Sequence, residues 1–203
     1  MSGLDDRRLY LITDARDGLT WLLERAIAGG VDVVQVREKA LPDALLLPRL
    51  EAAREVTASH GVPFVVNDRP DLARLVGADF VHVGQEDLPV EAARTFGIAV
   101  GQSTHAEAEI ARTTADYIGV GPVLATPTKQ GRAPVGLALV QYAAKSARRP
   151  WFAIGGIDLD TIDEVLEAGA TRVAVVRAIA ESSQPESAAR ALCSRIECYS
   201  GAA

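Results

Sequence analysis

The chain has 203 residues, enough for one sizeable domain or at most two small ones. Its composition is 48% hydrophobic and 24% charged, and its formal net charge of −6 argues against a nucleic-acid-binding surface. No stretch approaches the roughly 20 apolar residues of a membrane span, and the first six residues carry acid where a signal peptide needs base. The two cysteines form neither a disulfide framework nor a metal motif, so we expect a cytoplasmic protein.

Short apolar strands alternate with helices along the whole sequence. The predicted strands are Leu9–Thr13, Val31–Arg37, Phe64–Val66, Phe80–Val83, Ile98–Gly101, Tyr117–Val120, Trp151–Ile154 and Val173–Val176. The helices predicted to follow them are Leu19–Ala28, Asp43–Ser59, Pro70–Val76, Pro89–Phe96, Ala106–Thr113, Leu137–Ser146, Leu159–Ala168 and Pro185–Cys193.

This strict alternation implies right-handed βαβ units and a parallel sheet. Eight units, with nothing left over for a second domain, predict an α/β fold that is a single (β/α)8 TIM barrel. A doubly wound open sheet is the alternative, but the first strand–helix turn lacks a dinucleotide-binding glycine pattern. We expect residues 1–203 to form one domain, with flexible tails at residues 1–8 and from about residue 197 to 203.

The second predicted strand carries donor-rich side chains at its carboxyl end. Every second residue of a strand faces the same side, and one side here holds Val31, Val33, Gln35, Arg37 and Lys39. An amide, a guanidinium and an ammonium group aimed at one point suit an anion such as a phosphate or pyrophosphate. The alternative is a strand end that frays into a solvated loop.

Polar groups follow nearly every predicted strand, and in a TIM barrel the carboxyl ends of the strands hold the active site. Besides the second strand, the groups in question are Asn67-Asp68, Gln85–Asp87, Gln102–His105, Gly155-Gly156 and Arg177. The opposite rim offers mostly Gly, Ala and Val-Asp turns. This asymmetry between the two rims indicates an enzyme.

Asp68 and Asp87 follow adjacent predicted strands and could converge within metal-ligand distance. Mg²⁺ is usually held by one or two carboxylates together with waters and substrate phosphates, so a diphosphate–Mg²⁺ site fits this rim. Each aspartate also has a structural interpretation: Asp68 as a turn residue before Arg69-Pro70, and Asp87 as a helix-start residue before Leu88-Pro89.

A long segment, Gly121–Gly136, separates the sixth predicted strand from its helix. It carries Thr126, Thr128, Lys129 and Arg132, which suit a lid that closes over phosphates. The alternative is a mobile surface loop.

The turns after the seventh and eighth strands predict a second phosphate site. Gly155–Asp158 and Val176-Arg177 lie where this fold usually binds phosphate through backbone N–H groups. Among the histidines, His82 lies within a strand and is expected to be a hydrogen-bonded barrel residue, whereas His105 at a strand end could be catalytic.

Together these residues resemble the thiamine phosphate synthase (thiamine-phosphate pyrophosphorylase) family, over nearly the whole sequence. The stretches that carry the resemblance are Gln35–Lys39, Asn67-Asp68, His82–Asp87, Gly101–His105, Tyr117–Pro122, Thr126–Lys129 and Gly155–Ile157. Many members of the family have a serine where Arg177 stands, so this position departs from the pattern on which the resemblance rests.

The resemblance implies roles for individual residues. Arg37, Ser103 and Lys129 would be catalytic. The pyrimidine diphosphate would be held by Gln35, Arg37, Lys39, Asn67, Ser103 and Lys129, with Val36 and Glu38 in the same stretch. The thiazole phosphate would be held by Thr126, Pro127, Thr128, Gly156, Val176 and Arg177, and Mg²⁺ by Asp68 and Asp87.

The implied reaction joins a hydroxymethylpyrimidine diphosphate to a thiazole phosphate, plain or carboxylated, and releases pyrophosphate by a dissociative mechanism. Two alternatives stay open. One is a metal-free thiazole tautomerase of the same superfamily, in which the histidine matching His105 is catalytic, and the other is a non-catalytic phosphate-ligand sensor. The expected partners are small-molecule substrates, with no nucleic acid and no membrane, and the chain could form a homo-oligomer.

Overall fold

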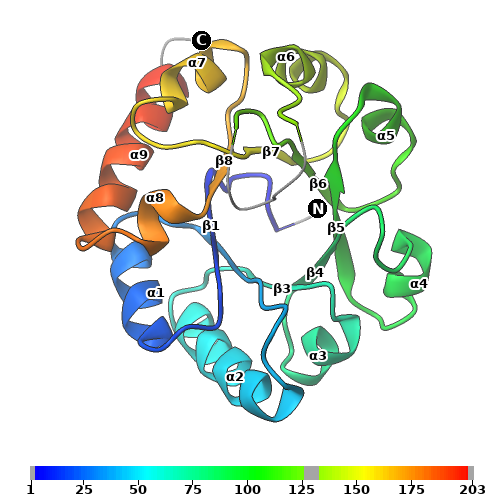
Figure 1. The fold of residues 1–203 in the computed structure, drawn as a ribbon, viewed down its shortest axis with the longest axis vertical. Helices are drawn as coiled ribbons and strands as arrows, with labels where there is room; N and C mark the ends of the chain where they lie inside the picture. Colours follow the sequence, from blue (N-terminus) through cyan, green and yellow to red (C-terminus); the bar gives the residue numbers. More distant parts are fainter. Residues whose placement is uncertain (1–2, 126–132, 201–203) are drawn as a thin grey trace.

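A computed structural model of the chain describes residues 3–125 and 133–200. Eight parallel strands pair in chain order, and β1 (Leu9–Thr13) pairs with β8 (Val173–Val175) to close the barrel (Figure 1). The helices lie in a ring outside the strands (Figure 1). The prediction of a (β/α)8 TIM barrel is therefore confirmed.

The remaining strands are β2 (Val33–Val36), β3 (Phe64–Asn67), β4 (Phe80–Val83), β5 (Ala99–Thr104), β6 (Tyr117–Val120) and β7 (Trp151–Ile154). The helices are α1 (Leu19–Ala28), α2 (Asp43–Ser59), α3 (Pro70–Leu75), α4 (Val90–Arg94), α5 (Glu107–Arg112), α6 (Leu137–Ser146), α7 (Ile162–Glu167), α8 (Arg177–Ala180) and α9 (Pro185–Ser200). No helix within the described ranges has the length and apolar character needed to span a membrane.

Several elements differ from the sequence prediction, and three of the differences are informative. The short helix α8 directly after β8 was not predicted, and α9 continues to Ser200 rather than ending at Cys193. Strand β2 is shorter than predicted, because the backbone N–H of Val31 still donates to Ala26 O (3.0 Å) in the turn that ends α1. Val31 therefore packs outside the barrel, not on the inward face with Val33.

The strands separate two apolar cores. Alternate strand residues point inward and form a small cluster that includes Tyr10, Phe80, Tyr117 and Phe152. The intervening residues point outward and pack against the helices in a much larger cluster. The fully buried Leu4 belongs to the inner cluster. That residue lies within the segment expected to be a flexible tail; the flexibility of the two ends stays a prediction.

Aspartates fasten the strands at the rim opposite to their carboxyl ends. Asp32, Asp79 and Asp116 each stand one residue before an even-numbered strand. Each carboxylate accepts a backbone N–H from the preceding odd-numbered strand: Leu9 N at 2.9 Å, Phe64 N at 2.8 Å and Val100 N at 2.8 Å. These bonds hold neighbouring strands in register and leave the carboxyl ends of the strands free for other chemistry.

Candidate active site

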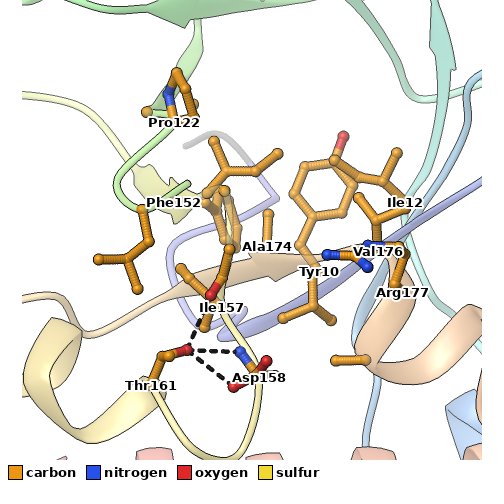
Figure 2. Close-up of a pocket in the computed structure, with 18 of the residues that line it drawn as sticks. Tyr10, Ile12, Pro122, Phe152, Ile157, Asp158, Thr161, Ala174, Val176 and Arg177 are labelled. Carbon is orange, nitrogen blue, oxygen red and sulfur yellow. Dashed lines mark hydrogen bonds between the residues drawn. The ribbon is translucent and has the colours of Figure 1, made fainter. Parts of the chain in front are cut away.

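A cavity of about 620 Å³ opens among the carboxyl ends of the strands and the loops that follow them. Figure 2 shows it between Tyr10 and Ile12 of β1, Phe152 of β7, and the Val176-Arg177 turn. Five of the predicted site residues line it: Arg37, Ser103, Gly156, Val176 and Arg177. The fold therefore gathers residues that are far apart in sequence at the rim where TIM barrels bind their substrates.

Two arginines give the mouth of this cavity its positive charge. Among the described residues, neither Arg37 nor Arg177 forms an ion pair with a carboxylate. Both also line a smaller adjoining cavity of about 460 Å³, where Arg16 is paired with Asp14. Unpaired guanidinium groups at a pocket wall suit a phosphate, which accepts two hydrogen bonds from each guanidinium.

The loop after β7 is held in place by its own side chains. Thr161 Oγ1 donates to Gly156 O (2.9 Å) and accepts from the backbone N–H of Asp158 (3.0 Å), as the dashed lines in Figure 2 show. Gly156 has φ 69°, and a Cβ there would lie 2.7 Å from Leu124 Cβ. Only glycine fits this close approach, which keeps the backbone near the cavity.

The two aspartates predicted to hold a metal lie together at the same rim. Asp68 and Asp87 lie close enough for their carboxyl groups to interact, and Lys39 Nζ lies 2.9 Å from Asp68 Oδ2. Burial raises the pKa of Asp68, and the neighbouring Asp87 carboxyl group raises it further, while the ammonium group of Lys39 lowers it. Asp68 also adopts the left-handed φ of 60°, which is uncommon for residues other than glycine and frequent at functional sites.

The convergence expected for Asp68 and Asp87 is thus present. Asp87 also accepts the backbone N–H of Gly84 (2.8 Å), so it orders its own loop as well. Within the described residues no cluster of three or more His, Cys, Asp or Glu side chains could hold a metal. A pair of carboxylates fits a hard cation whose other ligands are waters and substrate phosphates, the usual way Mg²⁺ is bound.

Residues 35–39, at the carboxyl end of β2, lie in different surroundings. Gln35 shares a face of β2 with Val33, as predicted, and this face points inward; Gln35 is buried there and its amide donates to Tyr10 Oη. Val36 is buried in the outer core, and the Glu38 carboxylate accepts backbone N–H groups of its own loop, among them Ala40 N at 2.8 Å. Gln35, Arg37 and Lys39 therefore do not converge on one point in this structure, because β2 ends at Val36 and the chain turns away. Their contacts with a substrate stay a prediction.

Asn67 and the histidines complete the rim. Asn67 is buried, and its Nδ2 has no hydrogen-bond partner among the described residues, which is a costly state that a ligand oxygen would relieve. His82 is hydrogen-bonded on both ring nitrogens, as predicted for a barrel histidine. His105 lines the cavity, and its Nδ1 bonds to Gly121 O.

Two functional candidates were missed by sequence reasoning, namely Tyr10 and Tyr117. Their hydroxyl groups bond to each other inside the barrel at 3.0 Å and to Gln35 and His82. The available signal was their position, because both fall on inward-facing strand positions, where a phenol needs a buried partner. The predicted residues Thr126, Pro127, Thr128 and Lys129, together with Arg132, lie outside the described residues.

A closed parallel barrel with a cavity and unpaired arginines at its carboxyl rim defines a (β/α)8-barrel enzyme. A family model described as thiamine monophosphate synthase matches residues 9–179. The chain therefore belongs to the thiamine monophosphate synthase family, and the resemblance drawn from the sequence is confirmed.

Several curated relatives match over nearly their full length. The chain is 52% identical to a thiamine-phosphate synthase of Thermus thermophilus, over 93% of this chain and 97% of that protein. It is 48% identical to a thiamine-phosphate synthase of Streptomyces avermitilis, over 95% of each. A solved thiamine phosphate pyrophosphorylase from Pyrococcus furiosus superposes with a TM-score of 0.86 at 31% identity, covering 95% of this chain and 96% of that one.

Proposed function

We propose that the chain is a thiamine-phosphate synthase that joins a hydroxymethylpyrimidine diphosphate to a thiazole phosphate and releases pyrophosphate. The observation that carries this proposal is the sequence identity of about 50% between this chain and thiamine-phosphate synthases, which extends across the whole barrel. The rim supports it independently, because unpaired Arg37 and Arg177 border a cavity large enough for phosphorylated heterocycles.

The two substrates enter from different parts of the rim. We assign the pyrimidine diphosphate to the side of β2, β3 and β5, where Arg37, Asn67 and Ser103 offer donors. The orphaned amide of Asn67 supports this assignment, because a diphosphate oxygen would satisfy it. We assign the thiazole phosphate to the loops after β7 and β8, where Gly156 brings backbone close to the cavity beside Arg177.

Asp68 and Asp87 would hold Mg²⁺, with Lys39 beside them for the diphosphate. Bound Mg²⁺ would supply positive charge against the diphosphate oxygens. Arg37, together with Lys129 outside the described residues, would stabilise the negative charge that develops as pyrophosphate leaves, and no side chain forms a covalent intermediate. The electron-rich aminopyrimidine supports the carbocation that remains, and the thiazole nitrogen held nearby captures it before water does.

A metal-free thiazole tautomerase is the rival that shares this barrel. Its activity would need His105, which lines the cavity. The paired carboxylates and Lys39 speak against it, since an isomerase has no diphosphate to bind.

The first test is formation of thiamine phosphate from the two purified substrates, with Mg²⁺ and after its removal by a chelator. We expect product only with Mg²⁺, and a fall in kcat/KM on the order of a hundredfold for Asp68→Ala, because a ligand to the diphosphate's counter-ion is lost. The exposed Asp6 on the opposite rim gives a control, and Asp6→Ala should leave the rate unchanged. Thiazole tautomerisation without product formation would move the assignment to the isomerase.

A further inference from the structure

Five polar side chains from five strands form a continuous hydrogen-bonded chain through the barrel. The Gln35 amide donates to Tyr10 Oη, which lies 3.0 Å from Tyr117 Oη. Tyr117 Oη lies 3.0 Å from His82 Nδ1, and His82 Nε2 lies 3.0 Å from Ser103 Oγ. These bonds therefore link Gln35 of β2 to Ser103 of β5, the residue assigned above to the pyrimidine substrate.

This hydrogen-bonded chain is largely buried in the barrel interior. All five side chains are buried, and only its Tyr10, His82 and Ser103 members also line the cavity. Burial raises the pKa of both tyrosines above the ordinary range, so each keeps its hydroxyl hydrogen and can act as a donor. Each phenol therefore donates one hydrogen bond and accepts another.

The need to satisfy buried donors gives this chain a direction. Tyr10 Oη accepts from the Gln35 amide, so its own hydrogen needs an acceptor, and among the described residues Tyr117 Oη is the one within reach. Tyr117 then donates to His82 Nδ1, which places the histidine hydrogen on Nε2, facing Ser103 Oγ. In the opposite direction Tyr10 Oη would accept from both Gln35 and Tyr117, and its own hydrogen would have no acceptor among the described residues, which is a costly state for a buried hydroxyl.

We propose that Tyr10, Tyr117 and His82 are positioning residues that turn the Ser103 hydroxyl hydrogen toward the cavity. Ser103 Oγ accepts from His82 and so keeps its own hydrogen for the substrate, which suits an oxygen or ring nitrogen of the pyrimidine diphosphate. This inference rests on the proposed function for the identity of that substrate. The direction of the hydrogen-bonded chain from Gln35 to Ser103 depends only on the hydrogen bonds.

The neighbouring strands leave room for these rings. A Cβ at Gly101 would lie 2.2 Å from Tyr117 Cε1, and a Cβ at Gly119 would lie 3.6 Å from His82 Cε1. Both glycines follow the inward-facing register, with Gly101 paired to Tyr117 and Gly119 paired to Ser103. An alanine at position 101 would displace the Tyr117 ring, so this glycine is part of the same arrangement.

The first experiment reads the tautomer of His82 and needs no activity. The chain has three histidines, so ¹⁵N-histidine labelling with a His82→Gln comparison assigns the His82 ring nitrogens. We expect a neutral ring with the hydrogen on Nε2. A hydrogen on Nδ1, or a doubly protonated ring, overturns the proposed direction.

The second experiment is a double-mutant cycle on kcat/KM for the pyrimidine diphosphate. Tyr117→Phe removes the central hydroxyl, and we expect a loss of about tenfold, the size of one buried hydrogen bond. In a Ser103→Ala background the same change should cost less than about twofold, since Tyr117 acts through Ser103. An equal loss in both backgrounds would mean that Tyr117 acts by another route and would overturn the proposal.

A control separates positioning from packing. The rings of Phe80 and Tyr117 form an edge-to-face pair with their centroids 5.5 Å apart, and Phe80 does not line the cavity. Phe80→Leu disturbs the packing of Tyr117 but leaves the Tyr117 hydroxyl in place. We therefore expect Phe80→Leu to change kcat/KM by the same factor in the wild-type and Ser103→Ala backgrounds. If the wild type makes no thiamine phosphate, the proposed function fails, while the His82 tautomer still decides the direction of the chain.

Discussion

Arg177 is the predicted site residue for which the resemblance to the family gives the least guidance. It is the first residue of α8, separated from the end of β8 by Val176, and it lines both cavities at the rim. No carboxylate among the described residues neutralises it. A guanidinium there adds a full charge and two parallel donors to a phosphate site otherwise made from backbone.

We therefore expect Arg177→Ser to raise KM for the thiazole phosphate about tenfold while kcat changes little, because the lost contact is to a group that does not react. Steady-state kinetics at two ionic strengths checks this, since the affinity of the wild type should fall more steeply with salt. Arg112 is exposed at the end of α5, away from the cavity, and Arg112→Ser changes the net charge equally. An increase in KM shared by both variants would contradict a local contact.

The elements are joined at the amino-terminal rim by the aspartates that precede β2, β4 and β6. Asp79 is the clearest case, because its carboxylate accepts Phe64 N at 2.8 Å and also pairs with Arg54 of α2 at 2.8 Å. It thus ties β3, β4 and α2 together. The position before β8 holds Arg172 instead, and its Nε is buried without a partner among the described residues.

Removing this tie should destabilise the fold without touching the active site. We expect Asp79→Ala to lower the free energy of unfolding by about 1–3 kcal/mol, because the buried Phe64 N–H loses its acceptor. Asp17 pairs with Arg49 but its side chain is 97% exposed, so Asp17→Ala should cost at most about 1 kcal/mol. Urea unfolding of both variants measures the difference, and equal midpoints would refute the role of Asp79.

The whole barrel is closed at its base by the residues before β1. Leu4 is 0% exposed and packs in the inner cluster with the aromatic side chains of the strands. The segment that carries it thus contributes to the core on which the cavity rests.

Leu4→Ala should lower the free energy of unfolding by about 2–5 kcal/mol, since it removes a buried side chain and leaves a cavity. Leu75 is 66% exposed on α3, and Leu75→Ala should change stability by well under 1 kcal/mol. Thermal unfolding of the two variants provides the comparison. If Leu4→Ala melted at the wild-type temperature, Leu4 would be dispensable for closing the barrel.

Much of the fold and part of the site could be read from the sequence. Regular alternation of strands and helices implied a parallel sheet, because parallel strands need crossover helices of fixed hand, and the count of eight units favoured a closed barrel over an open sheet. It also brought Ser103, Gly156 and Arg177 to one rim, since the carboxyl ends of parallel strands meet there. The inward position of Gln35 followed from the two-residue period of a strand.

Only the tertiary structure decided how side chains from distant strands meet. Tyr10 and Tyr117 are 107 residues apart, and no local sequence pattern predicts that their hydroxyl groups form a hydrogen bond. The contact of Asp68 with Asp87 likewise depends on how two loops fold back after β3 and β4. Strand period and order are local properties of a chain, whereas the partner of a buried polar group is set by closure of the barrel around it.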